Sequence, residues 1–165
     1  MAIAGDRVTV TVTVGVEPDV AFEVFTQEID LWWRKGVRYR VGARRPSVIC
    51  LEPRVGGRVF EQYEAEDGAR VHESGRITAW EPPGHLAFEW RGVNFEPGEV
   101  TLVEITFTAT ESGSTRVVLE HSGFAKLRPD HPVRHREPDV QFIRRLGLWW
   151  GDLLKALRER IADRS

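Results

Sequence analysis

The side chain best placed for acid–base chemistry is His121, which lies near the end of a segment where apolar and polar residues alternate. If that segment is a strand, Val117, Leu119 and His121 share one face, and the face should point inward. An inward histidine can act as a general base or a ligand-orienting donor. It can equally be a core residue satisfied by one hydrogen bond. No nucleophile or acid can be paired with His121 from the sequence, so both interpretations stay open.

Glu61 and Tyr63 are two further candidates for acid–base or orienting roles. They share one face with Val59 if residues 58–64 form a strand, although the register of that strand is ambiguous. Glu89 and Glu104 are expected to face outward, opposite their apolar neighbours, and are poor catalytic candidates. The sequence therefore assigns no catalytic residue.

His131 and His135 have the four-residue spacing that places two metal ligands on one face of a helix. Pro129 and Pro132 argue against a helix there, and no HExxH or CxxC motif accompanies the pair. The glycines at 56–57 enter a strand rather than a helix, so they do not form a phosphate-binding loop. We expect neither a metal ion nor a cofactor.

Aromatic side chains recur in the strands and in the last helical segment, and alternation would gather them between sheet and helix. They are Phe88, Trp90, Phe107, Phe124, Phe142, Trp149 and Trp150. Such a set either lines a cavity for a hydrophobic small molecule or fills a close-packed core. Gly147 and Gly151 raise the same question, since each glycine in a helix costs about 1 kcal/mol relative to alanine. Either a strand passes close to them or a ligand occupies the space.

A basic segment, Arg34–Arg45, contains six arginine or lysine residues, and no acidic residue lies between Leu31 and Leu51. It could attract an anionic head group or an acidic protein partner, or it could be an ordinary solvated loop. The formal net charge of −2 leaves too little basic surface for nucleic-acid binding.

Length and composition set the remaining bounds. The 165 residues fit one domain spanning 1–165, and the single Cys50 excludes an internal disulfide framework. No apolar run approaches the roughly 20 residues of a membrane span. No basic-then-apolar leader opens the chain. We expect a reduced, soluble, cytoplasmic domain that does not bind membranes.

Hydrophobic periodicity and turn signals give the order of elements. Period-two alternation predicts a first strand over residues 7–16. Pro18 suits the first turn of a helix, and a second short helix is expected around residues 28–33. Residues 34–45 and 124–137 are expected to be irregular, and helical spacing runs from about 138 to 162. Six further strands are expected over residues 47–52, 58–64, 69–80, 85–91, 99–110 and 115–122.

Four stretches carry turn and core signatures in this order of elements: Glu52–Arg58, Gly75–Pro83, Phe88–Trp90 and Thr115–Phe124. Together they resemble the bacterial single-domain relatives of the Hsp90 ATPase activator C-terminal domain, in the START-like, or Bet v 1-like (SRPBCC), superfamily. The resemblance covers about Val8 to Ile161. It implies an α+β helix-grip fold, with a seven-stranded antiparallel sheet around the C-terminal helix and an internal cavity. The motifs specify the fold and carry no catalytic residues.

The leading functional hypothesis is a binding protein for a hydrophobic small molecule held between helix and sheet. The lining is predicted to comprise Trp33, Tyr63, Phe88, Trp90, Val117, Leu119, His121, Phe142, Leu146 and Trp150. Residues 124–137 are the expected lid, with Phe124 closing the entrance and Arg128 and Arg134 available for an anionic head group. The basic segment and the turn at residues 92–98 would form the opposite rim.

Two other classes of function stay open. Resemblance to superfamily relatives such as the polyketide cyclases and aromatases implies an enzyme in which His121, Tyr63 and Glu61 would act on the ligand. The family name suggests a chaperone-associated interaction module instead, with Arg34–Arg45 as the contact to a protein partner.

Overall fold

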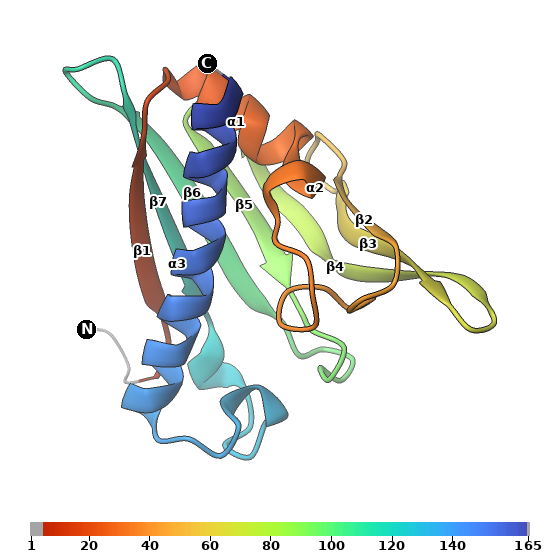
Figure 1. Cartoon of the computed structure of the whole chain (residues 1–165). Coiled ribbons are helices and arrows are strands. Elements are labelled where there is room, and N and C mark those ends of the chain that lie inside the picture. The colour runs from red at the N-terminus through yellow and green to blue at the C-terminus, as the bar shows by residue number, and fades with distance from the viewer. Residues whose placement is uncertain (1–4, 165) are drawn as a thin grey trace.

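The computed structural model describes residues 5–164. Seven antiparallel strands form one curved sheet in the order β1-β7-β6-β5-β4-β3-β2 (Figure 1). Their bounds are β1 Val8–Val14, β2 Ser47–Leu51, β3 Arg58–Ala65, β4 Gly68–Glu81, β5 His85–Trp90, β6 Thr101–Ala109 and β7 Thr115–Ser122. Two short helices, α1 (Pro18–Gln27) and α2 (Ile29–Trp32), follow β1, and the long helix α3 (Asp139–Arg164) closes the chain. This is the predicted helix-grip architecture, and the predicted strands and last helix have bounds within two residues of those observed.

The periodicities of the sequence explain this arrangement. On β1, Val8, Val12 and Val14 are buried, whereas the intervening threonines are exposed. Helix α3 buries a wide stripe against the sheet and the short helices: Phe142, Leu146, Trp150, Leu153, Leu154, Leu157 and Ile161. Each such side chain contributes about 1.5–3 kcal/mol when fully buried, so the docking of α3 makes a large contribution to the stability of the domain.

The glycine pair of α3 serves two different purposes. A Cβ on Gly147 would lie 3.2 Å from the Cγ2 of Val8, so this glycine allows β1 to approach the helix closely. A Cβ on Gly151 would meet no atom within 4 Å. Close packing therefore accounts for the first glycine and not for the second.

A β-bulge in β4 shapes the concave face of the sheet. The first half of β4 pairs with β3 and the second half with β5, and the β3 register shifts so that Ser74 has no partner. Any Cβ on Gly75 would lie 1.5 Å from the carbonyl oxygen of Glu89, so only glycine fits there. The amide of Arg91 donates to the carbonyl of Ser74 at 2.6 Å, which fixes the bulge to the end of β5. Bulges often re-aim side chains beside functional sites.

The segment 124–137, expected to be irregular, contains two 3-10 helices, Phe124–Lys126 and Pro132–Arg134. Side chains fasten it at several points. Arg134 donates to the carbonyl oxygen of Phe124, and Arg145 of α3 donates to the carboxylate of Glu137 at 3.1 Å. The prolines prevent a longer helix in this segment. These side-chain bonds hold its main chain in place instead.

The basic segment is not the freely solvated loop that its composition allows. Arg40 is 4% exposed and donates to Asp30 Oδ1 at 2.7 Å and to the carbonyl of Trp33 at 2.7 Å. Glu61 accepts from the amides of Val41 and Gly42, at 2.8 and 2.6 Å. The segment therefore folds back over the concave side of β2 and β3, and Arg40 is a buried structural cation within it.

Candidate functional site

The centre of the molecule holds four tryptophans in mutual contact. Trp33 stacks on Trp90 with ring centroids 5.9 Å apart and meets Trp149 and Trp150 edge-on at 5.8 and 5.7 Å. Trp90 also contacts Trp149 and Trp150, each at 6.3 Å. Aromatic side chains thus fill much of the space between helix and sheet.

Three of these indoles are fixed by hydrogen bonds. Trp33 Nε1 donates to the carbonyl of Tyr39 at 2.9 Å, and Trp149 Nε1 donates to the carbonyl of Arg38 at 2.7 Å. Trp150 Nε1 donates to His121 Nδ1 at 3.0 Å. Among residues 5–164, nothing accepts from the indole nitrogen of Trp90, which is therefore held by packing alone.

His121 lies at the centre of a closed hydrogen-bond chain. Its Nδ1 accepts from Trp150, and its Nε2 lies 2.7 Å from Thr101 Oγ1. Because the threonine hydroxyl donates to the carbonyl of Trp90 at 2.9 Å, it accepts from His121. These roles fix the tautomer, with hydrogen on Nε2 and a lone pair on Nδ1.

Both ring nitrogens of His121 are thus occupied, and the side chain is 2% exposed. Burial lowers the pKa of His121 to about 3, so the ring is neutral at physiological pH. A general base needs a free lone pair within reach of substrate, and His121 has none. The arrangement is that of a satisfied core histidine.

Two cavities lie on either side of Trp90. The first, here called the lid cavity, has a volume of about 140 Å³. It lies between α3, the end of β5 and the segment 124–137, and it is lined by Trp90, Phe95, His121, Phe124, Val133, Arg145, Leu146 and Trp149. An apolar cavity of about 150 Å³ is large enough to hold one benzene ring.

The second, here called the inner cavity, has a volume of about 70 Å³. It lies between β3, β4, β5 and the basic segment. Its lining is Ile29, Trp33, Tyr39, Val41, Ile49, Val59, Phe60, Glu61, His72, Ser74, Phe88, Trp90 and Gly92. This is about half the volume of a cavity that holds one benzene ring, so the inner cavity alone is too small for a ring.

The structure brings together some of the predicted lining residues and separates others. Trp33, Phe88 and Trp90 line the inner cavity, and Trp90, His121 and Leu146 line the lid cavity. Five residues line neither cavity: Tyr63, Val117, Leu119, Phe142 and Trp150. The last four are fully buried within the core, and the Tyr63 side chain lies beside Gly42 of the basic segment.

The lid residues have partners within the protein. Phe124 packs edge-on against Phe142 at 5.0 Å and lines the lid cavity. Arg128 donates to Glu99 at 3.0 Å, which holds the pKa of that carboxyl at about 2. Arg134 donates through Nη2 to the carbonyls of Phe124 and Leu127, whereas its buried Nε has no hydrogen-bond partner within the described residues. Both arginines therefore help to hold the segment in place.

Several residues of the cavities were not among the predicted ones. Phe95, Val133, Arg145 and Trp149 line the lid cavity, and His72 and Ser74 line the inner one. Trp149 belongs to the aromatic set, and Phe95 belongs to the predicted rim at residues 92–98. The alternation of apolar and polar residues does not predict that His72 or Ser74 faces the cavity, because the β-bulge in β4 interrupts the alternation next to them.

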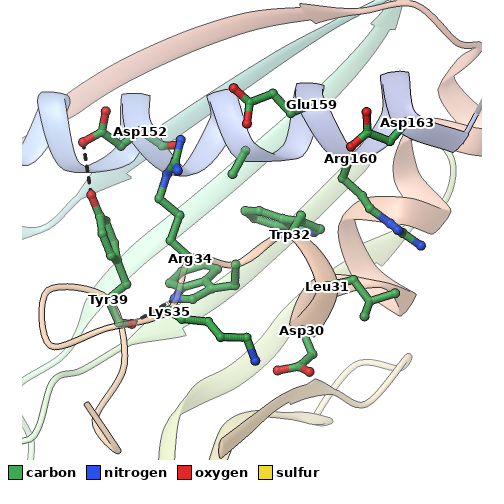
Figure 2. Close-up of a pocket in the computed structure, with 12 residues that line it drawn as sticks. Asp30, Leu31, Trp32, Arg34, Lys35, Tyr39, Asp152, Glu159, Arg160 and Asp163 are labelled. Carbon is green, nitrogen blue, oxygen red and sulfur yellow. Dashed lines mark hydrogen bonds between the residues drawn. The ribbon is translucent and has the colours of Figure 1, made fainter. Parts of the chain in front are cut away.

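A larger hollow of about 680 Å³ opens on the surface between α2, the basic segment and the C-terminal half of α3. Figure 2 shows Arg34 and Tyr39 reaching from the segment to α3. The Tyr39 hydroxyl donates to Asp152 Oδ2 at 3.1 Å, and Arg34 Nε donates to the carbonyl of Asp152 at 2.8 Å. Carboxylates and cations are mixed along its walls, so the groove favours no single ligand charge.

Two negative findings apply to the described part of the chain. No group of three or more histidine, cysteine, aspartate or glutamate side chains in it could hold a metal ion. No helix in it is long and apolar enough to cross a membrane.

Residues 16–142 match the model of the family described as activator of Hsp90 ATPase homolog 1-like protein. The chain belongs to this family. The match includes both 3-10 helices, the six strands β2 to β7, and the first turn of α3, and it begins after the end of β1. A search of curated proteins found no match.

Solved structures similar to this family member extend over nearly the whole chain. The protein MLL2253 from Mesorhizobium loti is 21% identical, with a TM-score of 0.63 over 96% of this chain and 98% of its own. NE0264 from Nitrosomonas europaea is 16% identical, with a TM-score of 0.63 over 99% and 98%. The anthrahydroquino-γ-pyrone synthase Txn09, solved in complex with SUM, is 27% identical, with a TM-score of 0.57 over 95% and 99%. The first two show the fold alone.

Proposed function

We propose that this protein binds a hydrophobic small molecule in the lid cavity. The observation that carries the proposal is a ring-sized apolar space, walled by Trp90, Phe95, Phe124 and Trp149, at the place where the helix grips the sheet. Ligand sites are typically concave, apolar and provided with few polar groups. At about 140 Å³, the cavity accepts a single aromatic ring or an aliphatic group of similar size.

Larger ligands would require Trp90 to move. Trp90 is the only residue that lines both cavities, and it alone among the four clustered tryptophans lacks a hydrogen bond from its indole in the described chain. Rotation of this indole would join the two spaces without breaking a hydrogen bond. The neighbouring indoles would stay in place as fixed walls.

An enzymatic role is a second candidate because of the likeness to Txn09, whose name denotes the synthesis of a polycyclic aromatic compound. Such a substrate needs several hundred Å³, more than either cavity provides. His121 cannot supply the base, since both of its nitrogens are occupied. Binding therefore agrees better with the geometry than a reaction in which His121 is the base.

The test uses benzene as ligand and the indole N–H signals of the six tryptophans in a ¹⁵N-labelled sample. We expect saturable shifts of the Trp90 and Trp149 signals, whereas Trp80, which lines neither cavity, should stay unchanged. Leu146→Trp, which fills the lid cavity from α3, should abolish the shifts. Absence of any saturable shift in the wild-type protein would refute the proposal.

A further inference from the structure

The inner cavity has one polar end within otherwise apolar walls. Glu61 on β3 and His72 on β4 are direct partners in the strand register, so their side chains lie on the same face. Ser74 follows at the bulge, and all three residues line the cavity. Glu61 is 4% exposed and Ser74 is 7% exposed. Three polar side chains thus meet where most of the wall is aromatic or aliphatic.

Glu61 retains hydrogen-bonding capacity in this position. Its Oε1 accepts from the amide of Val41 and its Oε2 from the amide of Gly42, and each carboxylate oxygen can accept a second hydrogen bond. None of the ion pairs within residues 5–164 involves Glu61. A donor entering the cavity would find an acceptor that no cation neutralises.

His72 and Ser74 add acceptors to the same end. His72 Nε2 lies 3.2 Å from the carbonyl oxygen of Arg91, and since a carbonyl only accepts, Nε2 carries the hydrogen. In the neutral ring, Nδ1 is then a free acceptor. The Ser74 hydroxyl forms no side-chain hydrogen bond with the rest of the described chain, so it can accept or donate.

The charge and the setting favour a neutral group that can form hydrogen bonds. An anion would be repelled by Glu61. A cation would be attracted by Glu61 and by the aromatic faces, but its removal from water costs far more than that of a neutral hydroxyl. A neutral hydroxyl can donate to Glu61 or His72 and accept from Ser74. We propose that the inner cavity binds the hydroxyl group of a phenol-type ligand whose ring system lies against Trp90. This inference rests on the proposed function, because the ring needs the space of the lid cavity.

The test compares 2-naphthol, naphthalene and 2-naphthoate, with affinities measured from the tryptophan indole shifts. Two rings exceed the lid cavity alone, so both neutral ligands should displace Trp90. We expect 2-naphthol to bind about 5–10-fold more tightly than naphthalene, the advantage of one or two net hydrogen bonds. The anionic 2-naphthoate should bind more weakly than naphthalene.

Variants locate the source of this preference. His72→Phe and Ser74→Ala should each reduce the advantage of 2-naphthol by about threefold and leave naphthalene binding unchanged. Thr78→Ala, which removes an exposed hydroxyl from the same strand, is the matched control and should change neither affinity. Ser74→Ala keeps the main-chain bond to Arg91, so the inference stays testable if His72→Phe fails to fold.

The outcomes separate the two proposals. If benzene and naphthalene both fail to bind, the proposed function is wrong. If naphthalene binds and 2-naphthol has no advantage, the polar end of the inner cavity is not a hydroxyl site. Tighter binding of 2-naphthoate than of naphthalene would likewise overturn the assignment.

Discussion

Acid should destabilise this protein through His121, and the size of the effect follows from its surroundings. In the unfolded chain a histidine takes up a proton near pH 6.5, whereas burial lowers the pKa of folded His121 to about 3. Between these values the unfolded state binds one more proton than the native state. Stability from this group is therefore complete above pH 6.5 and is lost as pH falls toward 3.

At pH 5 the free energy of unfolding should be about 2 kcal/mol lower than at neutral pH because of His121. This pH lies about 1.5 units below the pKa of the unfolded histidine, and each unit corresponds to about 1.4 kcal/mol. This loss is a large part of the 5–15 kcal/mol of a typical domain. Glu99 does not obscure the window, since its lowered pKa makes it a source of acid sensitivity only below about pH 4.5. His85 has a raised pKa through its hydrogen bond to Glu81, and its contribution has the opposite sign, being lost as pH rises.

The assay is urea unfolding of the wild type and of His121→Gln between pH 5 and 8. Glutamine can accept from Trp150 and donate to Thr101, but it does not titrate. His85 titrates in both proteins, so its effect cancels when the pH dependence of the variant is subtracted from that of the wild type. We expect the wild type to lose about 2 kcal/mol more than the variant on going from pH 8 to 5. Parallel losses in the two proteins would refute the buried, neutral His121.

Two further predictions concern stability at constant pH. Gly151→Ala should raise the free energy of unfolding by about 1 kcal/mol, since its Cβ enters open space; Gly147→Ala should gain less or lose, because its Cβ crowds Val8. Thermal unfolding of the two variants side by side would show this, and equal effects would contradict it. Arg40→Met should cost about 3 kcal/mol or more because Asp30 loses its buried partner, and chemical denaturation showing less than 1 kcal/mol would contradict that role.

Periodicity predicts the fold of this chain well because the strands keep one face buried from end to end. The inward direction of His121 follows from the alternation Val117, Leu119, His121, and the burial of all three confirms it. Its hydrogen-bond partners could not be predicted. Thr101 lies 20 residues away and Trp150 lies 29 residues away, and spacing along the chain does not show which indole meets which ring.

The inner cavity shows where sequence reasoning fails. The sequence predicts one continuous strand over residues 69–80, and in its first part Val71 is 55% exposed. The bulge then adds one residue and changes which face the chain presents, so Ser74 turns inward against the pattern. The signal for this bulge is Gly75, but a glycine in a strand shows only that a backbone passes close or that the strand bends.

The basic segment was also ambiguous for a physical reason. A run of arginines without acidic neighbours looks solvated when only the segment itself is considered. Its partners come from elsewhere: Asp30 of α2 pairs with the Arg40 side chain, and Glu61 of β3 accepts from main-chain amides of the segment. Long-range pairing of this kind becomes visible only when the topology is known, because both partners lie 10–20 residues from the groups they bind.

The space available to the proposed ligand is set by side chains and not by the fold. The helix-grip arrangement fixes where sheet and helix diverge, but in this chain four tryptophans in mutual contact lie between them. Three of these indoles are held in place by hydrogen bonds, so the space that they fill is not available to a ligand. Trp90 is not bonded in this way, and its position alone decides whether the protein offers one ring-sized space or a longer one with a polar end. The fold therefore supports a site between helix and sheet, and on the proposals made above Trp90, Glu61, His72 and Ser74 would determine which ligand fits there.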